Sequence, residues 1–338
     1  MKRKSNCPHG IHYISDDCQG FTRKKRGKGF EYFDCDGDKI TNKSAIERIE
    51  ELVIPPMWKD VWICQEDNGH LQVTGYDEKG RKQYIYHTKW TEYQQTNKFN
   101  RLKEFGEKLP LIRKRLEEDI NKKGWPKEKI LALIVMMLDE YYIRIGNKRY
   151  EHENKTYGLT TLRRKHITEK DGHLIIGFKA KSGKQREIDI THKKLIKLIK
   201  KTSELPGYEI FKYLDGEKKS HRLDSHDVNE YLADITGEYF TAKDFRTWGG
   251  TVLAIENIDE ARQEIEENPR KKLETALVKK VSSVLGNTVA VCREYYIHPK
   301  VMDVLLKNSV GHYTKRSLNG LKYKSELSKA EQLALKII

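Results

Sequence analysis

Two arginines, a lysine and a tyrosine lie where the local sequence should hold their side chains in place. Arg144 follows an expected helix in RIGNKRY, Lys181 lies in an expected hairpin loop in FKAKSGK, Arg246 lies in the first turn of a helix in TAKDFRTW, and Tyr296 lies near the end of a helix in REYYIHP. Guanidinium groups bind phosphate oxygens through paired N–H donors. Each residue alone also fits an ordinary role: a surface arginine, a turn lysine, an arginine paired with Asp244 or a core tyrosine.

The composition indicates a basic protein without a membrane span. The 338 residues include 65 Lys and Arg against 50 Asp and Glu, a formal charge of +15 that is spread along the chain. Such an excess suits a polyanion, although charge alone does not decide between nucleic acid and another acidic partner. The longest strongly apolar run, Ile130–Leu138, falls short of the roughly 18 residues of a membrane helix, and no signal peptide is visible. We therefore expect a soluble, cytoplasmic protein with no membrane partner.

Neither a metal nor a cofactor is expected. Five cysteines at irregular spacing indicate free thiols. Cys7, His9, His12 and Cys18 form the one zinc candidate, but their spacing matches no common finger or ribbon. The sequence has no P-loop and no carboxylate cluster suited to a pair of divalent ions, so we expect no requirement for ATP.

Hydrophobic periodicity predicts an α+β fold with a β-rich first part and a mostly helical second part. The expected strands of the first part are Phe30–Phe33, Val61–Cys64, Leu71–Thr74 and Lys82–Tyr86, with one helix at Lys43–Leu52. The expected helices of the second part are Phe99–Asn121, Lys127–Tyr142, His192–Lys201, Ser225–Ile235, Lys243–Ile255, Arg270–Leu285, Val289–Tyr296 and Lys329–Ile337, with one β-hairpin formed by His173–Phe178 and Arg186–Ile190. We expect a β-rich domain over residues 1–94, a linker near 90–98, and a larger, mostly helical domain over 95–338.

The four residues of chemical interest, in this order and on these elements, resemble the active site of type IB DNA topoisomerases. The resemblance covers nearly the whole chain and is nearest to the short bacterial, large-virus and poxvirus-like forms. It is carried by ISDD, RKKRGKGFEYFD, IPPMWKDVWIC and NGHLQVTGYDEKGRKQYIYH in the first part, and by RIGNKRYEHENKTYGLTTLRRKHI, FKAKSGK, TAKDFRTWGG and LGNTVAVCREYYIHP in the second. It implies an isomerase that relaxes supercoiled duplex DNA through a transient 3′-phosphotyrosyl bond, with two domains that form a clamp around the duplex.

Carried over residue by residue, the resemblance implies a role for five side chains. Tyr296 is the expected nucleophile, Arg144 and Arg246 the phosphate-binding arginines, and Lys181 the general acid that protonates the 5′-oxygen. Asn287, in LGNT, takes a place that histidine fills in the poxvirus and eukaryotic enzymes. An amide still donates a hydrogen bond to a phosphate oxygen, but it does not titrate as an imidazole does.

Two of these assignments have local competitors. Tyr295 and Tyr296 are adjacent, and adjacent side chains on a helix point about 100° apart, so only one of them faces the phosphate. Tyr296 keeps the family's nine-residue interval from Asn287, so we expect Tyr295 to be a packing residue. In the hairpin loop, Lys179 and Lys184 are the alternatives to Lys181.

The remaining expected contacts are with DNA. Tyr84 and Tyr86 alternate along one strand and should face the same side. Pattern alone fits a half-buried sheet face equally well, and the family resemblance favours DNA contact. We expect further DNA contacts from Arg81, Lys82, Gln83, Asn147 and Tyr150.

Two other classes of protein remain as alternatives. Tyrosine recombinases share the catalytic fold, but they usually carry a histidine shortly before the second arginine, where this chain has TAKDFR, and their N-terminal domain is helical. A catalytically inactive DNA-binding protein would have no reason to keep a tyrosine, two arginines, a lysine and an amide together. The expected enzyme is a monomer that acts on double-stranded DNA without an obligate protein partner, in a bacterial nucleoid or a viral factory.

Overall fold

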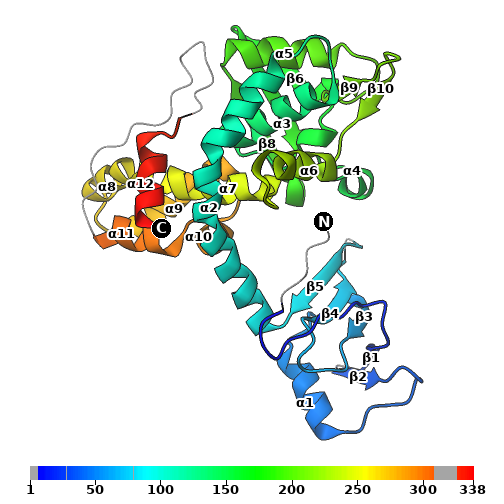
Figure 1. Cartoon of the computed structure of the whole chain (residues 1–338). Helices are drawn as coiled ribbons and strands as arrows, with labels where there is room; N and C mark the ends of the chain where they lie inside the picture. Colours follow the sequence, from blue (N-terminus) through cyan, green and yellow to red (C-terminus); the bar gives the residue numbers. More distant parts are fainter. Residues whose placement is uncertain (1–6, 28, 79, 308–325) are drawn as a thin grey trace. The chain divides into compact units, whose positions relative to one another are not determined.

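The computed structural model describes residues 7–27, 29–78, 80–307 and 326–338. The chain forms two compact units, Met1–Lys98 and Phe99–Ile338 (Figure 1). The sequence placed the division between residues 94 and 95. Among the described residues, no helix is long and apolar enough to cross a membrane.

The first unit is built on one antiparallel sheet with the strand order β2-β1-β3-β4-β5. Its elements are β1 (Phe21–Arg26), β2 (Gly29–Phe33), α1 (Lys43–Glu51), β3 (Lys59–Ile63), β4 (Leu71–Tyr76) and β5 (Lys82–Tyr86). The small core joins Ile49 of α1 to Tyr32, Val61, Ile63 and Val73 of the sheet. The β-rich first domain that the sequence predicted is therefore present.

Strand β1 was not predicted, because its sequence FTRKKR is dominated by basic residues. It pairs with both β2 and β3. The Arg23 guanidinium donates hydrogen bonds to the carbonyl oxygens of Ile54, Pro55 and Trp58 at 2.9 to 3.1 Å. Backbone pairing and these bonds hold a basic segment in the sheet even though it lacks apolar alternation.

The second unit is mostly helical. Its helices are α2 (Thr88–Ile120), which begins in the first unit, then α3 (Lys127–Tyr141), α4 (Lys148–Asn154), α5 (Lys193–Ser203), α6 (Ser225–Thr236), α7 (Ala242–Glu256), α8 (Ile258–Glu267), α9 (Leu273–Leu285), α10 (Val289–Tyr295), α11 (Pro299–Lys307) and α12 (Lys329–Ile337). Its strands are β6 (Ile167–Lys170), β7 (His173–Lys179), β8 (Gln185–Ile190), β9 (Lys212–Leu214) and β10 (Ser220–Arg222).

Three expectations about this part need correction. Residues 90–98, the expected linker, are helical and not irregular, because α2 begins at Thr88. The predicted hairpin is part of a three-stranded sheet, β6-β7-β8, and β9 and β10 form a second hairpin. Helices α4, α8 and α11 were not predicted, since each is short or carries too few apolar positions for its period to stand out.

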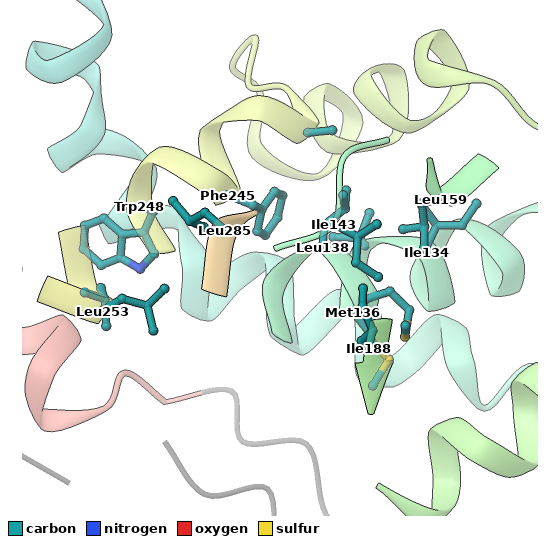
Figure 2. Close-up of a cluster of buried hydrophobic side chains, with 14 of the residues drawn as sticks. Ile134, Met136, Leu138, Ile143, Leu159, Ile188, Phe245, Trp248, Leu253 and Leu285 are labelled. Atoms are coloured by element: carbon teal, nitrogen blue, oxygen red, sulfur yellow. The ribbon is translucent and has the colours of Figure 1, made fainter. Parts of the chain in front are cut away.

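The core of the second unit surrounds α3, which is buried from Ile130 to Asp139. Side chains from α3, α7 and α9 meet there with Ile188 of β8, as Figure 2 shows for Ile134, Phe245, Trp248 and Leu285. A helix that is apolar on every face must be central in its domain. The far end of this helix is therefore held firmly, and that end precedes Arg144.

A buried ion cluster attaches the last helix to this core. The Arg113 guanidinium, which is fully buried, donates hydrogen bonds to Asp139 at 2.8 and 3.0 Å and to Glu331 of α12 at 2.6 and 3.1 Å. Trp248 of α7 also donates to Glu331. Paired charges of this kind are tolerated in a core because every donor and acceptor is satisfied. The contact ties α12 to α7, the helix that carries Arg246.

Candidate active site

Two helices of the second unit end in a residue with left-handed backbone conformation, and a candidate site residue lies just beyond each of these ends. Helix α3 ends at Tyr142 and α9 at Gly286, both in the left-handed conformation, with φ of 51° and 64°. Arg144 follows the first of these caps and Asn287 follows the second. The Arg144 side chain donates a hydrogen bond to the Asn287 Oδ1 atom, so the two helix ends meet there.

Arg246 completes this group. Thr241 is the N-cap of α7 and Asp244 completes its capping box at 2.7 Å, so Arg246 lies in the second turn and Asp244 is engaged at the cap. Arg246 donates to the Tyr142 carbonyl oxygen, and its Nη2 atom donates to the Leu285 carbonyl at 2.9 Å and to Asn287 Oδ1 at 3.4 Å. The ordinary alternative for this arginine, a pair with Asp244, is therefore wrong.

Two buried donors of this group have no hydrogen-bond partner among the described residues: Arg246 Nε and Asn287 Nδ2. Because two arginines donate to Asn287 Oδ1, the orientation of the amide is determined and its NH₂ group points away from them. A buried donor without a partner costs on the order of 1–3 kcal/mol. The site thus offers donors that an anionic ligand would satisfy.

Tyr296 lies against the same arginines. It is the C-cap of α10, and the Arg246 guanidinium lies over its ring at 5.1 Å from the centroid. Burial raises the pKa of the Tyr296 phenol, but the charge and hydrogen bond of Arg246, followed by the charges of Arg144 and Lys243, outweigh it, so the pKa is lowered. Burial and Arg144 in turn lower the pKa of Arg246 to about 10, which leaves it protonated at neutral pH. The surroundings therefore favour the phenolate, the form that acts as a nucleophile.

The two glycines of TWGG let α7 approach these groups closely. A Cβ atom at Gly249 would overlap the Tyr142 ring, and one at Gly250 would lie 3.0 Å from the Tyr296 Cβ atom and overlap the Tyr296 carbonyl oxygen. At the next residue of α7, Thr251 Oγ1 accepts a hydrogen bond from the His298 N–H at 3.0 Å. Helix α7 thus positions both Arg246 and the backbone around Tyr296.

If Tyr296 is the reacting group, as the resemblance to type IB topoisomerases implies, Gly250→Ala should lower DNA cleavage by about 10²-fold, because a methyl group there would displace Tyr296, and a 1 Å displacement of a reacting group costs about that much. Single-turnover cleavage measures the effect. Gly177→Ala is the matched control, since its Cβ would have no neighbour within 4 Å. Unchanged cleavage by Gly250→Ala would show that the position of Tyr296 does not depend on this contact.

The hairpin loop between β7 and β8 approaches the same turn. Lys181 is exposed there and begins a short loop in which Ser182 has a φ of 66°. Lys184 Nζ donates to the Asn287 carbonyl oxygen at 3.2 Å, which attaches the loop to the site. Lys179 is the last residue of β7. Its Cε atom lies 3.6 Å from the position that a Cβ atom on Gly183 would take. Lys184 is therefore engaged with the backbone of the site, and Lys181 is exposed beside it.

One residue of this region was not predicted from the sequence. Arg186 of β8 is half-buried and donates hydrogen bonds to the carbonyl oxygens of Leu285, Val284 and Tyr141. Burial, and then the charges of Arg246 and Arg144, lower its pKa to about 10. Alternation along β8 predicts which face of the strand Arg186 occupies. No local sequence pattern predicts that the ends of α3 and α9 pack against that face.

The expected DNA-binding residues of the first unit lie together on and before β5. Tyr84 and Tyr86 are 46% and 44% exposed, and their rings stack at 6.0 Å, so the prediction that they share a face is confirmed. Three neighbours are engaged with carboxylates: Arg81 and Gln83 with Asp77, and Lys82 with Asp16. A phosphate would have to compete with those carboxylates for them.

The other expected positions are less informative. Asn147 is exposed just before α4, and its carbonyl oxygen accepts a hydrogen bond from the Glu151 N–H. The backbone of Tyr150 lies in α4, and its side chain is outside the described part of the structure. Tyr295 is half-buried like Tyr296. Within the described residues, no group of three His, Cys, Asp or Glu side chains is arranged to hold a metal ion; His12 of the Cys/His cluster instead pairs with Glu66 at 2.6 Å.

Comparison with known proteins assigns the whole arrangement to one family. The family described as eukaryotic DNA topoisomerase I, catalytic core, matches residues 87–322, and that described as bacterial DNA topoisomerase IB, N-terminal domain, matches residues 29–77. DNA topoisomerase 1B of Acanthamoeba polyphaga mimivirus is 32% identical over 297 residues, 86% of this chain and 88% of that protein. DNA topoisomerase 1B of vaccinia virus is 25% identical over 271 residues, 77% of this chain and 82% of that protein.

Among solved structures, the XerH site-specific recombinase bound to its difH substrate is similar to 56% of this chain and 48% of that one, at 15% identity and a TM-score of 0.34. This likeness is too low to bear on function. The sequence matches, in contrast, extend over both units. The chain belongs to the type IB DNA topoisomerase family. It is therefore an isomerase that acts on DNA and relaxes supercoils by transient cleavage and rejoining of one strand.

Proposed function

We propose that Tyr296 is the nucleophile of this topoisomerase, that Arg144, Arg246 and Asn287 bind the scissile phosphate, and that Lys181 protonates the leaving 5′-oxygen. One observation supports the proposal most strongly: buried hydrogen-bond donors without partners lie in the same site as a tyrosine whose pKa is lowered. Arg246 Nε and Asn287 Nδ2 are buried without partners among the described residues, and the same arginines that adjoin them lower the pKa of Tyr296. A phosphate diester supplies the anionic oxygens that such donors bind.

The reaction begins when the Tyr296 phenol gives its proton to solvent water and its oxygen attacks phosphorus. Negative charge then concentrates on the nonbridging oxygens, where the guanidiniums of Arg144 and Arg246 and the Asn287 amide stabilise it. The bond from phosphorus to the 5′-oxygen breaks, Lys181 gives that oxygen a proton, and a 3′-phosphotyrosyl ester remains. The ester keeps the energy of the broken bond, so the 5′-hydroxyl reverses the reaction without external fuel. Rotation of the free strand between the two steps releases torsional strain.

We further propose that the substrate is double-stranded DNA and that the enzyme works as a cytoplasmic monomer. The exposed, stacked pair of Tyr84 and Tyr86 supports a role for the first unit in contacting the duplex. Arg81, Lys82 and Gln83 would turn from Asp77 and Asp16 to the DNA when it binds. Such contacts position the duplex and bias the cleavage site.

Incubation with negatively supercoiled plasmid, in EDTA and without ATP, tests the activity. We expect a ladder of relaxed topoisomers, formed with no second DNA site. A tyrosine recombinase would act only on paired sites, and an inactive DNA-binding protein would leave the plasmid supercoiled. Either result would overturn the proposal, and denaturation of the reaction should trap protein on the 3′ end of the broken strand.

Affinity for DNA should fall steeply as salt rises. Each phosphate that a basic side chain neutralises releases about one counterion, so log affinity should fall by about 0.9 per contact for each unit of log salt. The formal charge of +15 makes several such contacts available. Fluorescence anisotropy of a labelled duplex at a series of salt concentrations measures the slope. Affinity that stays constant from low to moderate salt would contradict a phosphate-based interface.

A further inference from the structure

Arg186 joins the C-terminal ends of two helices in the catalytic unit. Its Nη1 atom donates to the Leu285 carbonyl at 2.7 Å, and its Nη2 atom donates to the Val284 carbonyl at 2.9 Å and the Tyr141 carbonyl at 3.2 Å. The last carbonyls of a helix have no partner within the helix and carry the negative end of its dipole. A single guanidinium therefore satisfies acceptors of both α3 and α9.

Arg246 makes a parallel bridge between the same two ends. It donates to the carbonyl of Tyr142, next to the Arg186 acceptor Tyr141, and it shares the Leu285 carbonyl oxygen with Arg186. The residues just beyond these ends are Arg144 and Asn287. Two arginines from different elements thus hold the two segments that carry the phosphate-binding side chains.

Arg186 differs from Arg246 because it belongs to the hairpin. Lys184 and Arg186 are two apart in sequence and so lie on one face of the extended chain. Lys184 binds the Asn287 carbonyl in the turn after α9, and Arg186 binds the Leu285 carbonyl at the end of α9. The Ala180 N–H donates to the Lys184 carbonyl at 2.7 Å and closes the loop that contains Lys181. Arg186 thus attaches that loop to the end of α9 from a half-buried position.

We propose that Arg186 is a positioning residue for protonation of the leaving group. It holds the β7–β8 loop in register with the Asn287 turn, so that Lys181 stands at a fixed place relative to Arg144, Arg246 and Asn287. This inference rests on the proposed role of Lys181 as the general acid. It assigns to Arg186 no contact with DNA.

The electrostatics of the site agree with a geometric role. A third cation beside Arg144 and Arg246 is unfavourable, and burial adds to that cost. The hydrogen bonds to three backbone carbonyls offset it, since each is a charge-assisted bond. Gly286 leaves room for this arrangement, because a Cβ atom there would lie 2.9 Å from Arg186 Nη1.

Arg186→Lys tests the proposal, because it keeps the positive charge but loses the planar group that reaches three carbonyls. On a duplex with a normal 5′-oxygen at the scissile phosphate, we expect single-turnover cleavage to fall by about 10²-fold. On a duplex with sulfur in place of that oxygen, most of the defect should disappear, because a thiolate leaves without a proton. Equal defects on the two duplexes, or normal cleavage of both, would overturn the proposal.

A double mutant makes the test sharper. If Arg186 acts through Lys181, then Arg186→Lys in a Lys181→Ala background should slow cleavage of the oxygen duplex little further. Losses that multiply would show that Arg186 acts elsewhere. If Arg186→Lys does not fold by circular dichroism, the neutral variant Arg186→Gln, which keeps two donors, takes its place in both comparisons.

Arg164→Lys is the matched control. Arg164 also donates to backbone carbonyls, of Leu205 at 2.8 Å and Gly207 at 3.3 Å, but near the end of α5. Its loss should leave the ratio of oxygen to sulfur rates unchanged, and a changed ratio would mean that any lost arginine–carbonyl contact has this effect. Failure of the proposed function has a separate signature: the wild type would form no covalent product with either duplex.

Discussion

Tyr296→Phe is expected to abolish both relaxation of supercoiled plasmid and covalent capture of DNA. The substitution removes only the oxygen proposed to attack phosphorus, so no phosphotyrosyl ester should form. Loss of a nucleophile in other covalent enzymes costs on the order of 10⁶-fold, and we expect a loss of that scale here. Duplex binding, measured by anisotropy, should change little because Arg144, Arg246 and Asn287 remain.

Tyr295→Phe is the matched control for this prediction. The two tyrosines are adjacent, both are half-buried, and each variant loses one hydroxyl group. The structure favours Tyr296, because Arg246 lies over its ring and lowers its pKa together with Arg144. Tyr295→Phe should therefore keep most activity. An inactive Tyr295→Phe beside an active Tyr296→Phe would reverse the assignment.

Lys181→Ala is expected to slow cleavage of a normal duplex by about 10²–10⁴-fold, the range for loss of a general acid. The 5′-oxygen is a poor leaving group and departs only as it is protonated. With sulfur in its place, the leaving thiol has a much lower pKa, so the same variant should recover most of its rate. Single-turnover cleavage of both duplexes measures the two defects.

Arg246→Ala is the contrast to Lys181→Ala. Charge on the nonbridging oxygens develops with either leaving group, so sulfur should not restore the rate of Arg246→Ala. Lys179→Ala serves as the control within the loop and should cleave both duplexes at near-normal rates. Should Lys181→Ala be equally slow on both duplexes, Lys181 is not the acid, and Lys179 and Lys184 become the candidates.

Local sequence was a good guide to most elements and a poor one to others. The strand β5 and the helix α3 follow clear periods and lie close to where they were expected. The start of α2 was mistaken for a linker because TEYQQTNK shows no apolar stripe. Strand β1 was missed because the three backbone carbonyls that hold Arg23 belong to residues more than 30 positions away. Strand β1 is therefore stabilised by partners that its own residue types do not reveal.

The sequence by itself determined the chemistry of this protein: which side chains are available, their order along the chain, and the family whose motifs they match. Only the tertiary structure decided how those side chains are held. Leu285 and Arg186, about a hundred positions apart, meet through a backbone carbonyl, and Tyr142 accepts from Arg246 in the same way. Every residue has a backbone carbonyl, so residue type does not reveal which carbonyl oxygens at a helix terminus accept hydrogen bonds from these arginines. The packing of α3, α7, α9 and the hairpin selects them, and with them the positions of the reacting groups.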